Sequence, residues 1–147
     1  MYFEMTEFYK RDVYFVFDEE KNKNLDTFSF ENGQKLNINF PLIYNVDKLD
    51  NYINTYDLLP TFGSTTLVSN KFRSVFNDLN DTVQYLNTKI VDIKGHHNEN
   101  FFLLNILNIL PVMDVERSVY EFKKYGDAEI LNIKKLFIKD NGLKEYI

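Results

Sequence analysis

Two adjacent histidines, His96 and His97, are the side chains of this sequence with the clearest capacity for chemistry. They lie in a Gly-His-His-Asn stretch whose composition is typical of a loop. Imidazole binds divalent metals and serves as a general acid or base near neutral pH. The acidic residues that could complete a metal site are Asp92, Glu99 and Asp114. One hypothesis is therefore a small metal-dependent hydrolase built around this loop.

The alternative interpretation of the same loop is a solvated connection without chemistry. A metal site needs three or four ligands at defined spacings, and adjacent side chains rarely converge on one ion. The five glycines are scattered singly, so the sequence has no Gly-rich phosphate loop, and there are no cysteines to supply a thiol nucleophile or a thiolate zinc site. We therefore predict no catalytic residue, no metal site, no cofactor and no enzyme activity.

The charge balance indicates which partners fit. A net charge of −5 and a pI near 5.0 disfavour non-specific binding to nucleic acid or to an anionic membrane. If the charge serves binding, it favours a basic protein; otherwise it serves solubility. The acidic residues that we predict to bind a partner occupy two polar segments and are Asp18, Glu19, Glu20, Asp47, Asp50 and Asp57.

The composition predicts a folded cytoplasmic protein of one domain over residues 1–147. Hydrophobic residues make up 44% of the chain, with 14 Phe and 10 Tyr, which is far more than a disordered chain carries. Charged residues interrupt the N-terminal stretch, so it does not form a signal peptide. The longest apolar run, Phe101 to Val112, is shorter than the about 20 residues that cross a membrane as a helix.

The hydrophobic pattern predicts an α+β fold, with a mostly antiparallel sheet and one main helix packed on it. The helix spans about residues 69–80, because Phe72, Val75, Phe76 and Leu79 follow a helical spacing. Two alternating runs around Asn32-Gly33 predict a hairpin. The other predicted strands are residues 12–18, 82–93, 118–122 and 129–140.

The segment from Phe101 to Leu110 fits two structures. As a strand, each of its faces carries one asparagine among large apolar residues; as a helix, Asn105 and Asn108 share one stripe. Periodicity alone favours the helix. Residues 47–63 are also open, between a short helix and irregular structure.

Three stretches of the sequence resemble a known protein family. They are "LVSNKFRSVF", "KIVDIKGHHNENFFLLNILNILPVMDVERSVYEF" and "ILNIKKLFIKD". Their Val-Ser helix start, their Phe-Phe-Leu-Leu-Asn-Ile-Leu-Asn-Ile core and their Lys-Lys-Leu tail are similar to a family of bacterial immunity proteins, numbered eleven among those encoded beside polymorphic toxins. The resemblance covers about Thr66 to Asp140. It implies a protein that binds its cognate toxin, which is basic if charge contributes, and blocks it by occlusion without catalysis.

The resemblance also implies structural roles and a strand at residues 101–110. The residues with expected structural roles are Ser69 as a helix N-cap, Asn105 and Asn108 at a bend, and Asp114 and Ser118 in the following turn. A further helix start usually follows the Lys-Lys-Leu strand in this family, so we expect a domain that lacks the usual C-terminal segment. A remaining alternative is a non-catalytic subunit of a larger assembly, joined through an exposed edge strand.

Overall fold

The fold is that of a computed structural model of residues 1–147. The residues that the structure describes are 13–23, 25, 27–63, 65–76, 82–108, 112–125 and 128–139. The chain forms two compact units, Met1–Ile109 and Leu110–Ile147, which are described separately. The single domain over residues 1–147 stays a prediction.

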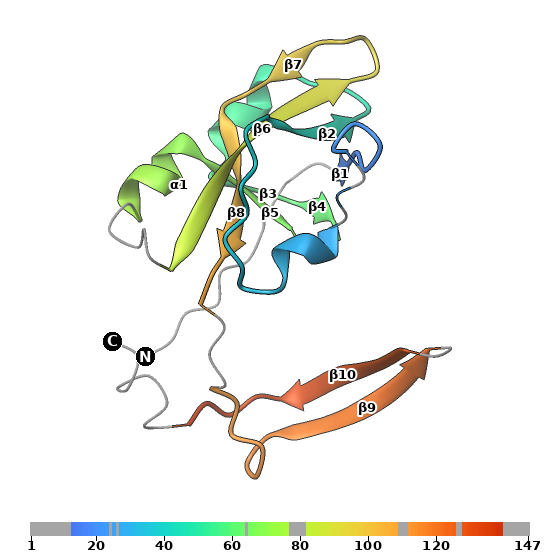
Figure 1. Ribbon diagram of the computed structural model, residues 1–147, viewed down its shortest axis with the longest axis vertical. Helices are drawn as coiled ribbons and strands as arrows, with labels where there is room; N and C mark the ends of the chain where they lie inside the picture. The colour runs from blue at the N-terminus through green and yellow to red at the C-terminus, as the bar shows by residue number, and fades with distance from the viewer. Residues whose placement is uncertain are drawn as a thin grey trace. The chain divides into compact units, whose positions relative to one another are not determined.

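The first unit is built on one curved sheet (Figure 1). The strand order is β3-β5-β8-β6-β2-β1-β4, and β7 pairs with β6 beside this path. β2 runs parallel to β6, and β1 runs parallel to β4, whereas the other pairs are antiparallel. The strands are β1 (Phe15–Phe17), β2 (Leu42–Val46), β3 (Leu58–Leu59), β4 (Thr61–Phe62), β5 (Thr66–Ser69), β6 (Val83–Asp92), β7 (His97–Asn98) and β8 (Phe101–Ile106).

Pro60 joins the two ends of this sheet. It is the only residue between β3, which pairs with β5 at one end of the order, and β4, which pairs with β1 at the other. Proline has no N–H to continue a strand ladder, which favours a corner here. Its carbonyl accepts a hydrogen bond from the Phe15 N–H at 3.0 Å. The sheet consequently curls into a nearly closed barrel.

The core of the first unit lies inside this barrel. In β2, Leu42, Tyr44 and Val46 are buried, while the residues between them are partly exposed, as the two-residue period of a strand requires. Two 3-10 helices, η1 (Thr27–Phe30) and η2 (Asn51–Thr55), each add one buried residue. The buried apolar cluster contains Phe15, Phe17, Phe30, Leu42, Tyr44, Val46, Ile53, Leu59, Leu67, Leu86, Ile90, Phe101 and Leu103.

The predicted α+β class is wrong, because the protein is mostly β, and among the described residues no helical layer covers the sheet of the first unit. The predicted helix of residues 69–80 starts as expected: the Ser69 hydroxyl accepts a hydrogen bond from the Phe72 N–H at 3.0 Å. The helix, α1, spans only Asn70–Val75 and has no buried residue. Residues 77–80 lie outside the described residues. A sheet that curls on itself buries its own apolar side chains, so a packed helix is not required.

Two further predictions, a strand at residues 101–110 and a hairpin at Asn32-Gly33, have different outcomes. Residues 101–106 form the strand β8, as the resemblance implies, so the periodicity argument for a helix is wrong. The predicted hairpin at Asn32-Gly33 is also wrong, since a 3-10 helix precedes the pair and no strand follows it directly. Instead, the Leu36 backbone pairs with a side chain: its N–H donates to Gln84 Oε1 at 3.0 Å, and its carbonyl accepts from Gln84 Nε2 at 2.7 Å.

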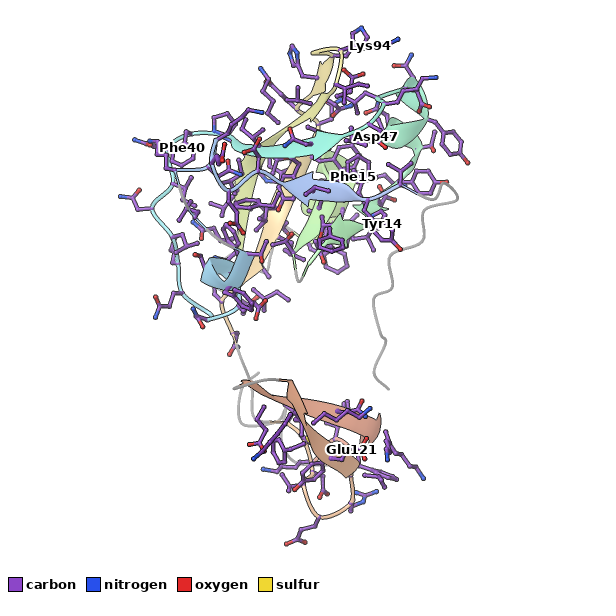
Figure 2. All side chains as sticks on the ribbon, turned by 90° about the vertical axis from the view of Figure 1, so that its right-hand side faces the viewer. Tyr14, Phe15, Phe40, Asp47, Lys94 and Glu121 are labelled. Carbon is purple, nitrogen blue, oxygen red and sulfur yellow. The ribbon has the colours of Figure 1, made fainter. Side chains whose placement is uncertain are left out.

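The second unit contains an antiparallel pair, β9 (Val119–Tyr125) and β10 (Ala128–Lys135), as the sequence predicts. The register places Tyr120 opposite Ile133 and Phe122 opposite Leu131, so apolar residues share one face. Glu121, labelled in Figure 2, belongs to the other face, where it accepts hydrogen bonds from Asn132 and Lys134.

The turn before β9 contains Asp114 and Ser118. The Asp114 carboxylate accepts a hydrogen bond from the Arg117 N–H at 3.1 Å, and the Asp114 carbonyl accepts one from the Ser118 N–H at 2.9 Å. The Ser118 hydroxyl also accepts a hydrogen bond from the Phe137 N–H at 2.9 Å. The Asp114 N–H in turn donates to the Phe137 carbonyl at 2.8 Å, so both residues hold the turn to the segment that follows β10.

Candidate protein-binding face

Strand register brings distant segments together on the outside of the barrel. Val16 in β1 pairs with Phe62 in β4 on one side and with Asn45 in β2 on the other. Asn45 in turn pairs with Val91 in β6. Paired residues project to the same face of a sheet, so these four side chains form one row across the outer surface.

A second row follows two residues further along each strand. The same registers, extended by two positions, place Tyr14, Asp47 and Ile93 next to one another. Figure 2 shows Tyr14, just before β1, and Asp47, just after β2, at the same end of this strand pair. We call the two rows, together with Asp18, the mixed face, because they combine apolar and acidic side chains.

The apolar side chains of the mixed face are unusually exposed. The exposed fraction is 56% for Tyr14, 45% for Val16, 71% for Phe62 and 82% for Ile93. Scattered apolar residues are common on protein surfaces, but a contiguous group rimmed by polar residues marks an interaction site. A hollow of about 330 Å³ lies within this group, and its lining residues are Val13, Tyr14, Val16, Asn45, Val46, Asp47 and Ile93.

Asp18 is held in place at one edge of the mixed face. Its carboxylate accepts hydrogen bonds from the Lys21 N–H at 2.9 Å and from Asn45 Nδ2 at 2.8 Å, and it forms an ion pair with Lys21 Nζ at 2.8 Å. The bonds from Lys21 and then from Asn45 lower the pKa of Asp18 to about 2. Asp18 is therefore ionised at neutral pH and fixes the amide of Asn45.

The structure separates the six acidic residues predicted to bind a partner. Asp18 and Asp47 lie on the mixed face, and Glu19 and Glu20 are exposed in the turn after β1. Asp50 and Asp57 have local roles instead. The Asp50 carboxylate accepts a hydrogen bond from the Tyr52 N–H at the start of η2. Asp57 accepts one from the Ser69 hydroxyl at 2.7 Å and forms an ion pair with Lys71 at 3.3 Å. The hydrogen bond from Ser69 contributes most to lowering the pKa of Asp57.

Asn105 and Asn108 occupy different environments. Asn105 is fully buried in β8, and its Nδ2 donates to the Gln34 carbonyl at 2.9 Å and to Gln84 Oε1 at 3.1 Å. Asn108 lies beyond the end of β8 and is exposed. The two asparagines do not form a common site in the structure.

The histidine loop is organised by a buried carboxylate. The Asp92 side chain accepts hydrogen bonds from the backbone N–H groups of Leu49, Lys94 and His96, and it lies 2.9 Å from His96 Nδ1. His97 lies nearer to Glu99, with 3.8 Å between Nε2 and Oε1. In the described part of the chain, no three histidine or acidic side chains cluster closely enough to hold a metal ion. Asp92 therefore shapes the turn between β6 and β7.

Acidification should destabilise this turn. Burial alone would raise the pKa of Asp92, but its hydrogen bonds from His96, Leu49 and Lys94 together lower it to about 2. The stabilisation is therefore complete above the ordinary carboxyl pKa of 3.8 and is lost as the pH falls from there towards 2. We expect a shallower fall of the free energy of unfolding over this range in Asp92→Asn than in the wild type, measured by urea denaturation.

The matched control for this prediction is Glu99→Gln, which removes an exposed carboxylate from the same region and should change the slope less than Asp92→Asn does. Asp18 contributes in the same pH range, so the slope of Asp92→Asn should be reduced but not abolished. Parallel curves for the wild type and Asp92→Asn would contradict the prediction.

The apolar members of the mixed face are not among the residues that sequence reasoning selected. A strand is predicted for residues 12–18, and its phenylalanines, Phe15 and Phe17, are buried while Val16 is exposed. A signal for the face is present in that stretch, because a strand that is apolar at consecutive positions has an apolar outer surface. Phe62 and Ile93 carry no such signal, since they join the face only through strand pairing.

The comparisons with known proteins agree with the resemblance in the sequence. The model of the immunity protein family Imm11 matches residues 11–145, a wider span than residues 66–140. No curated protein matches the chain. No helix in the described ranges combines the length and the apolar composition needed to cross a membrane. Because the family match covers nearly the whole sequence, the chain belongs to the Imm11 immunity protein family.

Proposed function

We propose that this protein protects the cytoplasm of its producer by binding one cognate toxin and occluding it, without catalysis. The family match carries the proposal, because it places the chain among immunity proteins. The mixed face supports it independently, since an exposed apolar group with an acidic rim suits binding to a protein. The acidic balance of the chain makes a basic protein the expected partner, rather than nucleic acid or an anionic membrane.

The two components of the mixed face have different roles in this proposal. Asp18 and Asp47, with the neighbouring Glu19 and Glu20, attract a basic toxin and raise the rate of encounter. The exposed aromatic and aliphatic side chains lose water on contact and slow dissociation. Salt should therefore reduce the association rate more than it raises the dissociation rate.

Co-expression tests the proposed function. The toxin encoded beside this chain's gene should arrest growth alone, and growth should return when the immunity protein is co-expressed. Occlusion further predicts a complex of one toxin with one immunity protein and an unchanged intact mass of the toxin recovered from it. Failure to restore growth would reject the immunity function, whereas a covalent change in the toxin would reject occlusion without catalysis.

Substitution of Ile93 by lysine should weaken toxin binding by at least about tenfold. The change removes an apolar contact and places a cation on the surface that is proposed to receive a basic partner. Val75→Lys is the matched control, because Val75 is an exposed aliphatic residue of α1, outside the mixed face. Isothermal titration calorimetry with the purified toxin measures both. Equal affinities of the two variants would place the interface elsewhere.

A further inference from the structure

We propose that the hollow of the mixed face is an anchor site for a single arginine side chain of the partner. The inference rests on the proposed function and adds the chemistry of the contact. At about 330 Å³, the hollow is at the small end of the range of ligand pockets, so it suits one side chain better than a cofactor. Its lining combines a carboxylate, an amide, an aromatic ring and aliphatic groups, each of which has a counterpart in arginine.

The hydrogen-bond acceptors of the hollow, Asn45 and Asp47, lie in β2 and directly after it. Asp47 and Asn45 are two residues apart and therefore project to the same side, with their Cα atoms about 6.6 Å apart. Asn45 Nδ2 is occupied by Asp18, which leaves Asn45 Oδ1 as an acceptor. Asp47 is exposed and takes part in none of the ion pairs found among the described residues. A guanidinium group, with five N–H donors in one plane, can use both acceptors together.

The apolar lining favours arginine over lysine. Tyr14 supplies an aromatic ring beside Asp47, and guanidinium groups stack on aromatic faces while they hydrogen-bond at their edges. Val16 and Ile93 provide aliphatic walls for the methylene stem. An ammonium group is a compact and strongly hydrated charge, so it would lose more hydration in this hollow and could not bridge the two acceptors as a planar fork.

The charge of the first unit favours a foreign partner over a second copy of this chain. Residues 1–109 contain 15 acidic and 10 basic residues, and the mixed face itself carries Asp18 and Asp47. A second copy would bring a surface of the same sign to this face, at an electrostatic cost. A basic surface with a protruding arginine complements both the charge and the hollow.

Binding of the toxin to two charge-matched variants tests the site. Asp47→Asn should weaken the complex by roughly 30-fold or more, the loss that defines a hot spot. Glu31→Gln removes an exposed negative charge beside η1, outside the mixed face, and should change the affinity by less than about threefold. One arginine substitution in the toxin should show the same loss, and this loss should not add to that of Asp47→Asn.

The possible outcomes distinguish failure of the anchor site from failure of the proposed function. If the toxin binds and Asp47→Asn behaves like Glu31→Gln, the anchor site is rejected while immunity stands. If the wild type does not bind the toxin, the proposed function is rejected, and the site is judged with N-acetyl-arginine amide alone. NMR titration should then show saturable shifts of the Val16 and Ile93 methyl groups that Asp47→Asn abolishes. Absence of saturable shifts, or equal shifts with the lysine analogue, would overturn the proposal.

Discussion

Replacement of Leu103 by alanine should lower the free energy of unfolding by about 2–5 kcal/mol. Leu103 is fully buried in β8, the strand that joins β5 to β6. Its partners in the ladder are Leu67 and Leu86, which are also buried, so the cavity is lined on both sides by residues that the sheet holds in place. Urea denaturation followed by circular dichroism measures the loss.

Leu104 provides a matched control for this substitution, because it is the same residue type at the next position. It faces the other side of β8 and is partly exposed, so Leu104→Ala should cost about 1 kcal/mol or less. The pair also tests the structure of residues 101–106, since only a strand places consecutive residues on opposite faces. Equal losses for the two variants would contradict the inward and outward alternation of β8.

The same alternation explains why the sequence left this segment open. Phe101, Leu103 and Asn105 face inward, and Phe102 and Leu104 face outward, so each face carries large apolar groups and neither period stands out. One of the outward residues, Phe102, lies under the Arg73 guanidinium, whose Cζ is 4.7 Å from the ring centroid. The local sequence pattern cannot reveal such a long-range contact. The family resemblance reflects it indirectly, and it implies the strand correctly.

The barrel itself could not be predicted from local pattern for a related reason. Its closure depends on β3 and β4, which are two residues each and separated by Pro60, so they are too short to give a periodic signal. A sheet that does not close needs a second layer to cover its apolar face. The helical spacing of residues 69–80 suggested a helix in that role. The observed α1 has the predicted cap but no buried residue.

The mixed face could be predicted from the sequence only in part. Charge alone selected Asp18 and Asp47, which do lie on this face, but it also selected Asp50 and Asp57, which serve local hydrogen bonds. The difference between these residues is their tertiary neighbours. Register between β1, β2 and β6 gives Asp47 its apolar surroundings, and this register joins segments about 30 and about 45 residues apart in sequence.

Asn105→Asp should lower the free energy of unfolding by about 3–5 kcal/mol at pH 7. The Asn105 Nδ2 donates to two acceptors, the Gln34 carbonyl and Gln84 Oε1, in a fully buried position. A carboxylate there would face two acceptors with no donor of its own. Because Gln84 also holds the Leu36 backbone, the conflict would reach the segment beside the sheet.

The pH dependence of this variant distinguishes a buried charge from a simple loss of packing. Burial raises the pKa of the introduced carboxyl above its value in the unfolded chain, so the folded state binds the proton more tightly. Relative to the wild type, Asn105→Asp should therefore regain stability as the pH falls from 7 towards the ordinary carboxyl pKa of about 4. Asn108→Asp, at an exposed position beyond β8, should stay within about 0.5 kcal/mol of the wild type throughout. A pH-independent loss in Asn105→Asp would mean that the introduced carboxyl reaches water. The two hydrogen bonds of Asn105 would then order the packing around it but would not keep a charge out of the core.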